Sequence, residues 1–139
     1  MDDLSRRSGG RKAKSVVFTA EQIAARVASL GREITSAYPD GDLVLLGLLK
    51  GSFIFLADLV RAVERPLQVD FLVVSSYGTG TVSSGNVRLL YDPATDLAGK
   101  HIVVVEDIID SGRTLTRLVE LLRARHPASL AICTLLDKQ

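Results

Sequence analysis

The chain has 139 residues, of which 47% are hydrophobic and 24% are charged, and its formal net charge is +1. This length predicts one globular domain with a buried core and excludes two ordinary domains, while the small net charge gives no support to bulk nucleic-acid binding. No apolar run reaches the roughly 18 residues of a membrane span. The single cysteine, Cys133, cannot form an intramolecular disulfide, so a reducing, cytoplasmic location is expected.

The first 15 residues are expected to form a disordered basic leader. The first 14 residues carry five basic and two acidic side chains, and residues 5–12 contain no apolar side chain to bury. An arm that binds nucleic acid is the alternative interpretation, but short basic termini are usually only solvated. We therefore assign the folded domain to residues 16–139 and expect neither nucleic acid nor a membrane as a partner.

Strands and helices are predicted to alternate along the rest of the chain. Thr19–Gln22 has the pattern of a capping box, which opens a helix, and the unbroken apolar run that follows is typical of a strand covered on both faces. The predicted elements are a helix over 20–38, a strand over 43–49, a helix over 52–63, strands over 68–75, 87–91 and 101–105, a helix over 112–126 and a strand over 129–136.

This order predicts an α/β fold, with a mostly parallel central sheet and helices on both faces. Ligands of such sheets bind beyond the carboxyl ends of the strands. The unusual polar segments all follow strands, so four separate peptides are expected to converge on one edge and form a site there. These segments are 50–52, 75–78, 106–114 and 137–138.

The most informative of them runs from Glu106 to Thr114. Two adjacent acids, Glu106 and Asp107, follow an apolar strand, and a turn rich in hydroxyl groups and glycine then opens a helix. The unpaired amides of a helix N-terminus and the helix dipole favour a phosphate. Neighbouring carboxylates suit the hydroxyls of a ribose, or a divalent cation held through water. The alternative is a solvated turn, but the combination of acids and phosphate cradle argues against it.

This segment resembles the signature of type I phosphoribosyltransferases, and the chain is similar to their hypoxanthine-guanine subfamily across roughly residues 18–138. The resemblance implies a type I phosphoribosyltransferase-like fold. It also implies transfer of a ribosyl phosphate from phosphoribosyl pyrophosphate (PRPP) to hypoxanthine or guanine, with Mg²⁺ on the pyrophosphate. The segments that carry it, in the same order as in the subfamily, are Leu48–Phe53, Ser75–Gly78, Val105–Gly112 and Leu135–Lys138.

The same resemblance implies a role for individual positions. Asp110 would be the catalytic residue, acting as general base or hydrogen-bond partner toward the purine imidazole nitrogen. The other implied roles are ribose and metal binding by Glu106 and Asp107; 5′-phosphate binding by Asp110, Ser111, Gly112, Arg113 and Thr114; pyrophosphate binding by Lys50 and Gly51, with a cis peptide at Leu49–Lys50; closure of a flexible loop by Ser76 and Tyr77; and purine recognition by Lys138.

The subfamily continues beyond the position of Gln139 into a base-binding segment, which this chain is expected to lack. A nucleotide- or PRPP-binding module with little turnover is therefore the alternative to an enzyme. The phosphate motif recognises only the shared substrate, so xanthine, orotate and adenine remain alternative bases, although segments 48–52 and 135–138 favour a 6-oxopurine. Motifs for dinucleotide-binding domains and P-loops are incomplete or missing. The family resemblance suggests a homodimer or homotetramer.

Overall fold

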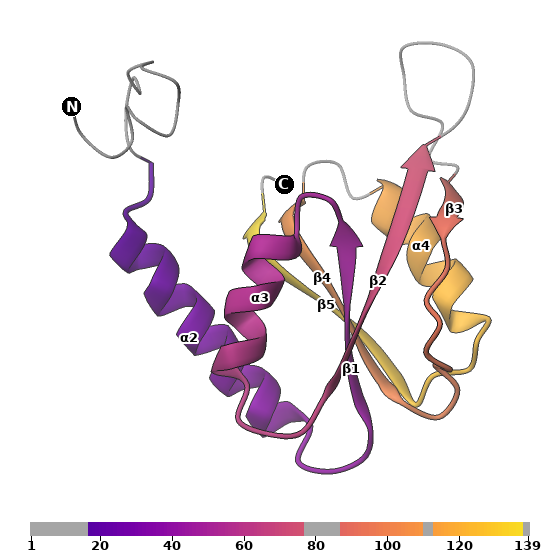
Figure 1. Ribbon diagram of the computed structural model, residues 1–139, viewed down its shortest axis with the longest axis horizontal. Helices are drawn as coiled ribbons and strands as arrows, with labels where there is room; N and C mark the ends of the chain where they lie inside the picture. The colour runs from indigo at the N-terminus through magenta and orange to yellow at the C-terminus, as the bar shows by residue number, and fades with distance from the viewer. Residues whose placement is uncertain (1–16, 77–86, 110–112, 138–139) are drawn as a thin grey trace.

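The computed structural model describes residues 17–76, 87–109 and 113–137. Within these residues five strands and three helices follow one another in the predicted order (Figure 1). The elements are α2 (Ala20–Ala37), β1 (Leu43–Leu49), α3 (Phe53–Ala62), β2 (Gln68–Ser76), β3 (Val87–Tyr91), β4 (His101–Ile109), α4 (Arg113–Arg123) and β5 (Ser129–Asp137).

The strands form a single sheet in the order β3-β2-β1-β4-β5. Strand β1 pairs in parallel with β2 and β4, and β4 pairs in parallel with β5, whereas β3 returns antiparallel to β2. The mostly parallel sheet is therefore confirmed. The central strand, β1, is buried along Leu43–Leu48, which explains its continuous apolar sequence.

Helices cover both faces of the sheet, as predicted. Side chains of β1 and β4 alternate between the faces, so Leu45, Val103 and Val105 pack with α2 and α3, while Val44 and Val104 pack with α4. Burying a side chain of this kind stabilises the fold by roughly 1.5–3 kcal/mol relative to leaving it exposed. Figure 1 shows α2 and α3 on one side and α4 on the other.

The N-terminus of α2 is fixed by the predicted capping box. Thr19 Oγ1 accepts a hydrogen bond from the Gln22 amide, and Gln22 Oε1 accepts one from the Thr19 amide. Further along the helix, a Cβ atom on Gly31 would come within 2.4–2.6 Å of Ala62 on α3. Only glycine therefore permits this helix crossing, which sets the position of α3 and of the turn that precedes it.

Two boundaries differ from the prediction by more than one residue. Strand β4 continues through Glu106 and Asp107 to Ile109 because its pairing with β5 continues, with Ile109 opposite Asp137. Acidic side chains do not interrupt this pairing, since the ladder uses main-chain groups. Helix α4 ends at Arg123, three residues earlier than predicted, and is followed by tight turns that bring His126 to φ 59°.

Candidate active site at the carboxyl edge of the sheet

The turn after β1 and the end of β4 meet at the carboxyl edge of the sheet. A Cβ atom built on Gly51 would lie 3.4 and 3.5 Å from the two carboxylate oxygens of Asp107. Lys50, the residue before Gly51, is exposed. The structure thus brings together two segments that are more than fifty residues apart in the sequence, as the convergence argument predicted.

The two acids start from opposite faces of β4, but their carboxyl groups lie close enough to interact. By strand alternation Asp107 lies on the same face as Val105, which packs with α3, and its approach to Gly51 agrees with this placement. Glu106 lies on the face that α4 covers. Each carboxylate accepts a hydrogen bond from the next amide, with Asp107 N at 2.9 Å from Glu106 Oε1 and Ile108 N at 2.9 Å from Asp107 Oδ1. These bonds hold both side chains against the strand.

Burial raises the pKa of Glu106 to about 7, and the neighbouring carboxyl group of Asp107 acts in the same direction. The described residues contain no cluster of three or more His, Cys, Asp or Glu side chains that could hold a metal ion. At this edge the carboxylates of Glu106 and Asp107 repel each other. A hard divalent cation fits this donor set, because it prefers oxygen ligands and would relieve the repulsion.

The turn after β1 has the cis peptide bond at Leu49–Lys50 that the resemblance implied. Residues 50–52 lead directly into α3, and the Phe53 amide lies 3.4 Å from the carbonyl oxygen of Lys50. Gly51 therefore lies beside Asp107 at the carboxyl edge, and the exposed Lys50 precedes it in the chain. Their predicted role in pyrophosphate binding stays a prediction.

The structure describes only some of the other predicted site residues. Strand β4 ends at Ile109 and α4 begins at Arg113, so the predicted phosphate turn joins these two elements. Backbone positions are described for Ser76, Arg113 and Thr114. Outside the described residues lie Tyr77, Asp110, Ser111, Gly112 and Lys138.

Two residues that sequence reasoning missed support this edge. Ser52 is fully buried, and its Oγ donates a hydrogen bond to the carbonyl oxygen of Leu48. Thr134 on β5 donates through Oγ1 to the carbonyl oxygen of Leu136 at 2.9 Å and, at 3.4 Å, to that of Asp107. The available signals were a hydroxyl residue just before α3 and another inside β5, but the sequence pattern does not identify the hydrogen-bond partner of either.

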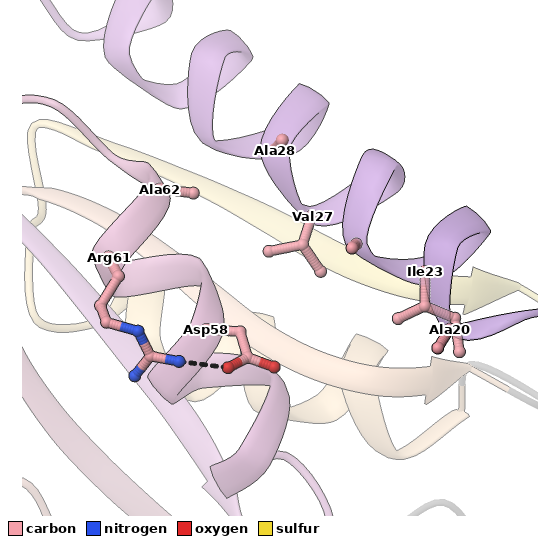
Figure 2. Close-up of a pocket in the computed structure, with 8 residues that line it drawn as sticks. Ala20, Ile23, Val27, Ala28, Asp58, Arg61 and Ala62 are labelled. Carbon is pink, nitrogen blue, oxygen red and sulfur yellow. Dashed lines mark hydrogen bonds and ion pairs between the residues drawn. The ribbon is translucent and has the colours of Figure 1, made fainter.

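A groove with a volume of about 540 Å³ lies between α2 and α3, as Figure 2 shows. Its lining is mainly alanine and aliphatic side chains, including Ile23 and Val27. The charged residues in this lining are Asp58 and Arg61, which form an ion pair with each other. The charged groups of this groove are therefore paired with each other, whereas the carboxyl edge has an exposed Lys50 and two neighbouring carboxyl groups.

Comparison with known proteins points to one family. Residues 15–139 match the model of the phosphoribosyl transferase domain. The chain is 52% identical over 125 residues to the hypoxanthine phosphoribosyltransferase of Salmonella typhimurium, covering 88% of this chain and 70% of that protein. It is also 52% identical over 131 residues to the hypoxanthine-guanine phosphoribosyltransferase of Mycobacterium avium, covering 90% of this chain and 64% of that protein.

The fold gives the same result. A crystal structure of a hypoxanthine phosphoribosyltransferase from Staphylococcus aureus superposes with a TM-score of 0.90 at 38% identity, covering 99% of this chain and 73% of that one. The chain thus spans between 64% and 73% of the length of these three relatives. The family model, the sequence relatives and the fold agree, and the chain belongs to the phosphoribosyltransferase family.

Proposed function

We propose that this chain is a purine salvage phosphoribosyltransferase that transfers the phosphoribosyl group of PRPP to hypoxanthine, and also to guanine. The observation that carries the proposal is the contact between the Lys50–Gly51 turn and Asp107. It gathers an exposed lysine and two carboxylates close to the start of α4. PRPP presents a pyrophosphate, vicinal hydroxyls and a 5′-phosphate on one sugar, and these groups complement that arrangement.

In the proposed reaction, an imidazole nitrogen of the purine forms a bond to C1′ of PRPP. The bond from C1′ to the pyrophosphate oxygen breaks, and pyrophosphate leaves with the bonding electrons. Asp110 accepts the proton that the purine loses, or hydrogen-bonds to the nitrogen that carries it. Fixed amides and cationic groups stabilise the growing charge on the leaving group without reorganising.

The remaining residues would bind and orient the substrates. Glu106 and Asp107 would bind the ribose hydroxyls, and the turn formed by Asp110, Ser111, Gly112, Arg113 and Thr114 would bind the 5′-phosphate. Lys50 and Gly51 would bind pyrophosphate, and Ser76 and Tyr77 would exclude water from the reacting centre. Lys138 would donate a hydrogen bond to the 6-oxo group, which adenine lacks.

Mg²⁺ is the proposed cofactor, and Glu106 and Asp107 are the residues proposed to hold it. Support comes from the raised pKa of Glu106, because a carboxyl group that is costly to ionise beside another carboxyl group gains from a cation. When bound, the ion would neutralise negative charge on the pyrophosphate.

We also propose a cytoplasmic location and a homodimer or homotetramer. The location is supported by Cys133, which is a free, buried thiol of the kind that a reducing compartment maintains. None of the helices within residues 17–76, 87–109 and 113–137 is long and apolar enough to cross a membrane. Light scattering on the purified chain would measure the oligomeric state.

The test is release of pyrophosphate by the purified chain in the presence of PRPP, Mg²⁺ and one base at a time. Release with hypoxanthine, and little with adenine, is the expected result. Release with adenine but not hypoxanthine would contradict the proposed base. Tight binding of PRPP with no release would contradict the enzyme and favour a binding module instead.

A further inference from the structure

Ser52 connects the end of β1 to the start of α3. Its Oγ donates to the carbonyl oxygen of Leu48 at 2.5 Å, and its amide donates to the same oxygen at 3.3 Å. On the other side, its own carbonyl oxygen accepts from the Leu56 amide at 2.8 Å. Ser52, which is fully buried, is thus hydrogen-bonded both to Leu48, the last buried residue of β1, and to the first turn of α3.

The hydroxyl of Ser52 lies at a tightly packed position. Pairing of β1 with β4 ends at Gly47, so Leu48 is one residue beyond the last pair on that side. A Cβ atom on Gly47 would lie 2.7 Å from Leu56 and 3.4 Å from Ser52 Oγ. There is little room for the hydroxyl to rotate away, and a buried carbonyl oxygen that loses a donor is costly.

This bond closes the strand-to-helix turn that contains Lys50 and Gly51. Residues 49–51 span the interval between the carbonyl of Leu48 and the hydroxyl of Ser52. Gly51 in turn lies against the Asp107 carboxylate. Loosening the bond would therefore displace the turn relative to β4, and displacements of this kind are costly at sites that bind charged ligands.

We propose that Ser52 is a positioning residue for pyrophosphate: its hydroxyl fixes the Lys50–Gly51 turn against Asp107 in the geometry that binds the pyrophosphate group. Ser52 does not itself touch the ligand, because its side chain is fully buried beneath the turn. The inference rests on the proposed function and deepens it, since it separates the residue that fixes the turn from the residues that contact the substrate.

The experiment compares Ser52→Ala, which removes the hydroxyl, with Ser52→Cys, which keeps its shape but donates weakly. The matched control is Thr35→Ala. Thr35 Oγ1 also donates to the carbonyl four residues earlier, that of Gly31, at 2.7 Å, but it lies in α2, away from the carboxyl edge. Calorimetry measures Kd for magnesium pyrophosphate and for IMP, which has no pyrophosphate group, and thermal unfolding is followed for each variant.

We expect Kd for pyrophosphate to rise about five-fold in Ser52→Ala and about two-fold in Ser52→Cys. Kd for IMP should stay within about two-fold of wild type, and Thr35→Ala should change neither Kd. An unchanged pyrophosphate Kd in Ser52→Ala would overturn the inference. The inference would also be overturned if binding of pyrophosphate and of IMP weakened equally, in proportion to the loss of thermal stability, in both Ser52→Ala and Thr35→Ala. If the wild-type chain bound no pyrophosphate, the proposed function would fail together with the inference.

Discussion

The two ends of the central sheet use their polar groups in opposite ways. At the amino edge, the Arg65 guanidinium donates to the carbonyl oxygens of Tyr38, Asp40 and Gly41, and His101 Nδ1 lies 2.6 Å from Ser129 Oγ. At the carboxyl edge, an exposed Lys50 lies near a carboxyl pair in which the pKa of Glu106 is raised. The amino edge is thus closed by its own hydrogen bonds, whereas the carboxyl edge presents charged groups to a ligand.

This difference predicts that substitutions at the two edges separate stability from function. Hydrogen bonds that join loops stabilise the folded chain, while charges that are held ready for a substrate cost stability and are repaid on binding. Each of the following substitutions tests one side of that comparison.

The largest effect is expected for Asp110→Asn at the carboxyl edge. Loss of the general base should lower kcat/KM for hypoxanthine by about 10²- to 10⁴-fold, with little change in melting temperature. The pyrophosphate-release assay and a thermal melt measure both quantities. Asp40→Asn at the amino edge is the control and should retain wild-type activity. Near-normal turnover in Asp110→Asn would remove that residue from the catalytic role.

Lys50→Ala should follow, with an increase in Kd for PRPP of roughly ten- to hundred-fold, because a charge-assisted hydrogen bond to phosphate is lost. Lys100→Ala is the matched control, since the Lys100 ammonium lies at the amino edge, 3.3 Å from Gln68 Oε1. Calorimetric titration with PRPP compares the two variants. Equal weakening by both would show that general positive charge, and not the turn after β1, attracts the ligand.

Arg65→Met should produce the reverse pattern. The variant keeps an apolar stem but loses the donors to four carbonyl oxygens, including that of Pro66, so the free energy of unfolding should fall by about 2 kcal/mol. Urea unfolding measures this loss, and kcat/KM measured well below the melting temperature should stay unchanged. Reduced turnover in a folded Arg65→Met protein would mean that the amino edge also acts in catalysis.

The smallest effect concerns pH. Because the pKa of Glu106 is raised from 4.5 to about 7 by folding, its protonated form is favoured in the folded chain. Its contribution to stability is therefore fully present below about pH 4.5 and is lost as pH rises to about 7. Without divalent cations, the melting temperature of wild type relative to Glu106→Gln should fall by about 3 °C between pH 4 and pH 8. Parallel pH profiles would contradict this assignment.

The fold could be predicted from the sequence wherever the local residue pattern matches the burial of the element it forms. The capping box at Thr19 and the unbroken apolar run of β1 each have one structural interpretation, and both are confirmed. The end of β4 was missed because side-chain polarity does not limit a main-chain ladder, and Glu106 continues the pairing with Thr134 of β5. Polarity marks where the site lies, but the neighbouring strand decides where the element ends.

The site was predicted as a set of converging segments, and the contact between Gly51 and Asp107 bears this out for two of them. The supporting residues could not be predicted in the same way. The hydroxyl of Ser52, immediately before a helix, resembles an N-cap, yet it makes no capping bond and donates backward to Leu48. That choice depends on the path of the turn in three dimensions, which a one-dimensional pattern does not contain.

The most direct test of whether the carboxyl edge binds the ligand is an NMR titration of the ¹⁵N-labelled chain with PRPP and Mg²⁺, in which the amide chemical shifts are recorded. Large changes are expected at residues 50–52 and 105–115, with none at residues 38–42 or 126–129 of the amino edge. Changes confined to the amino edge, or to the groove between α2 and α3, with residues 105–115 unaffected, would contradict the account.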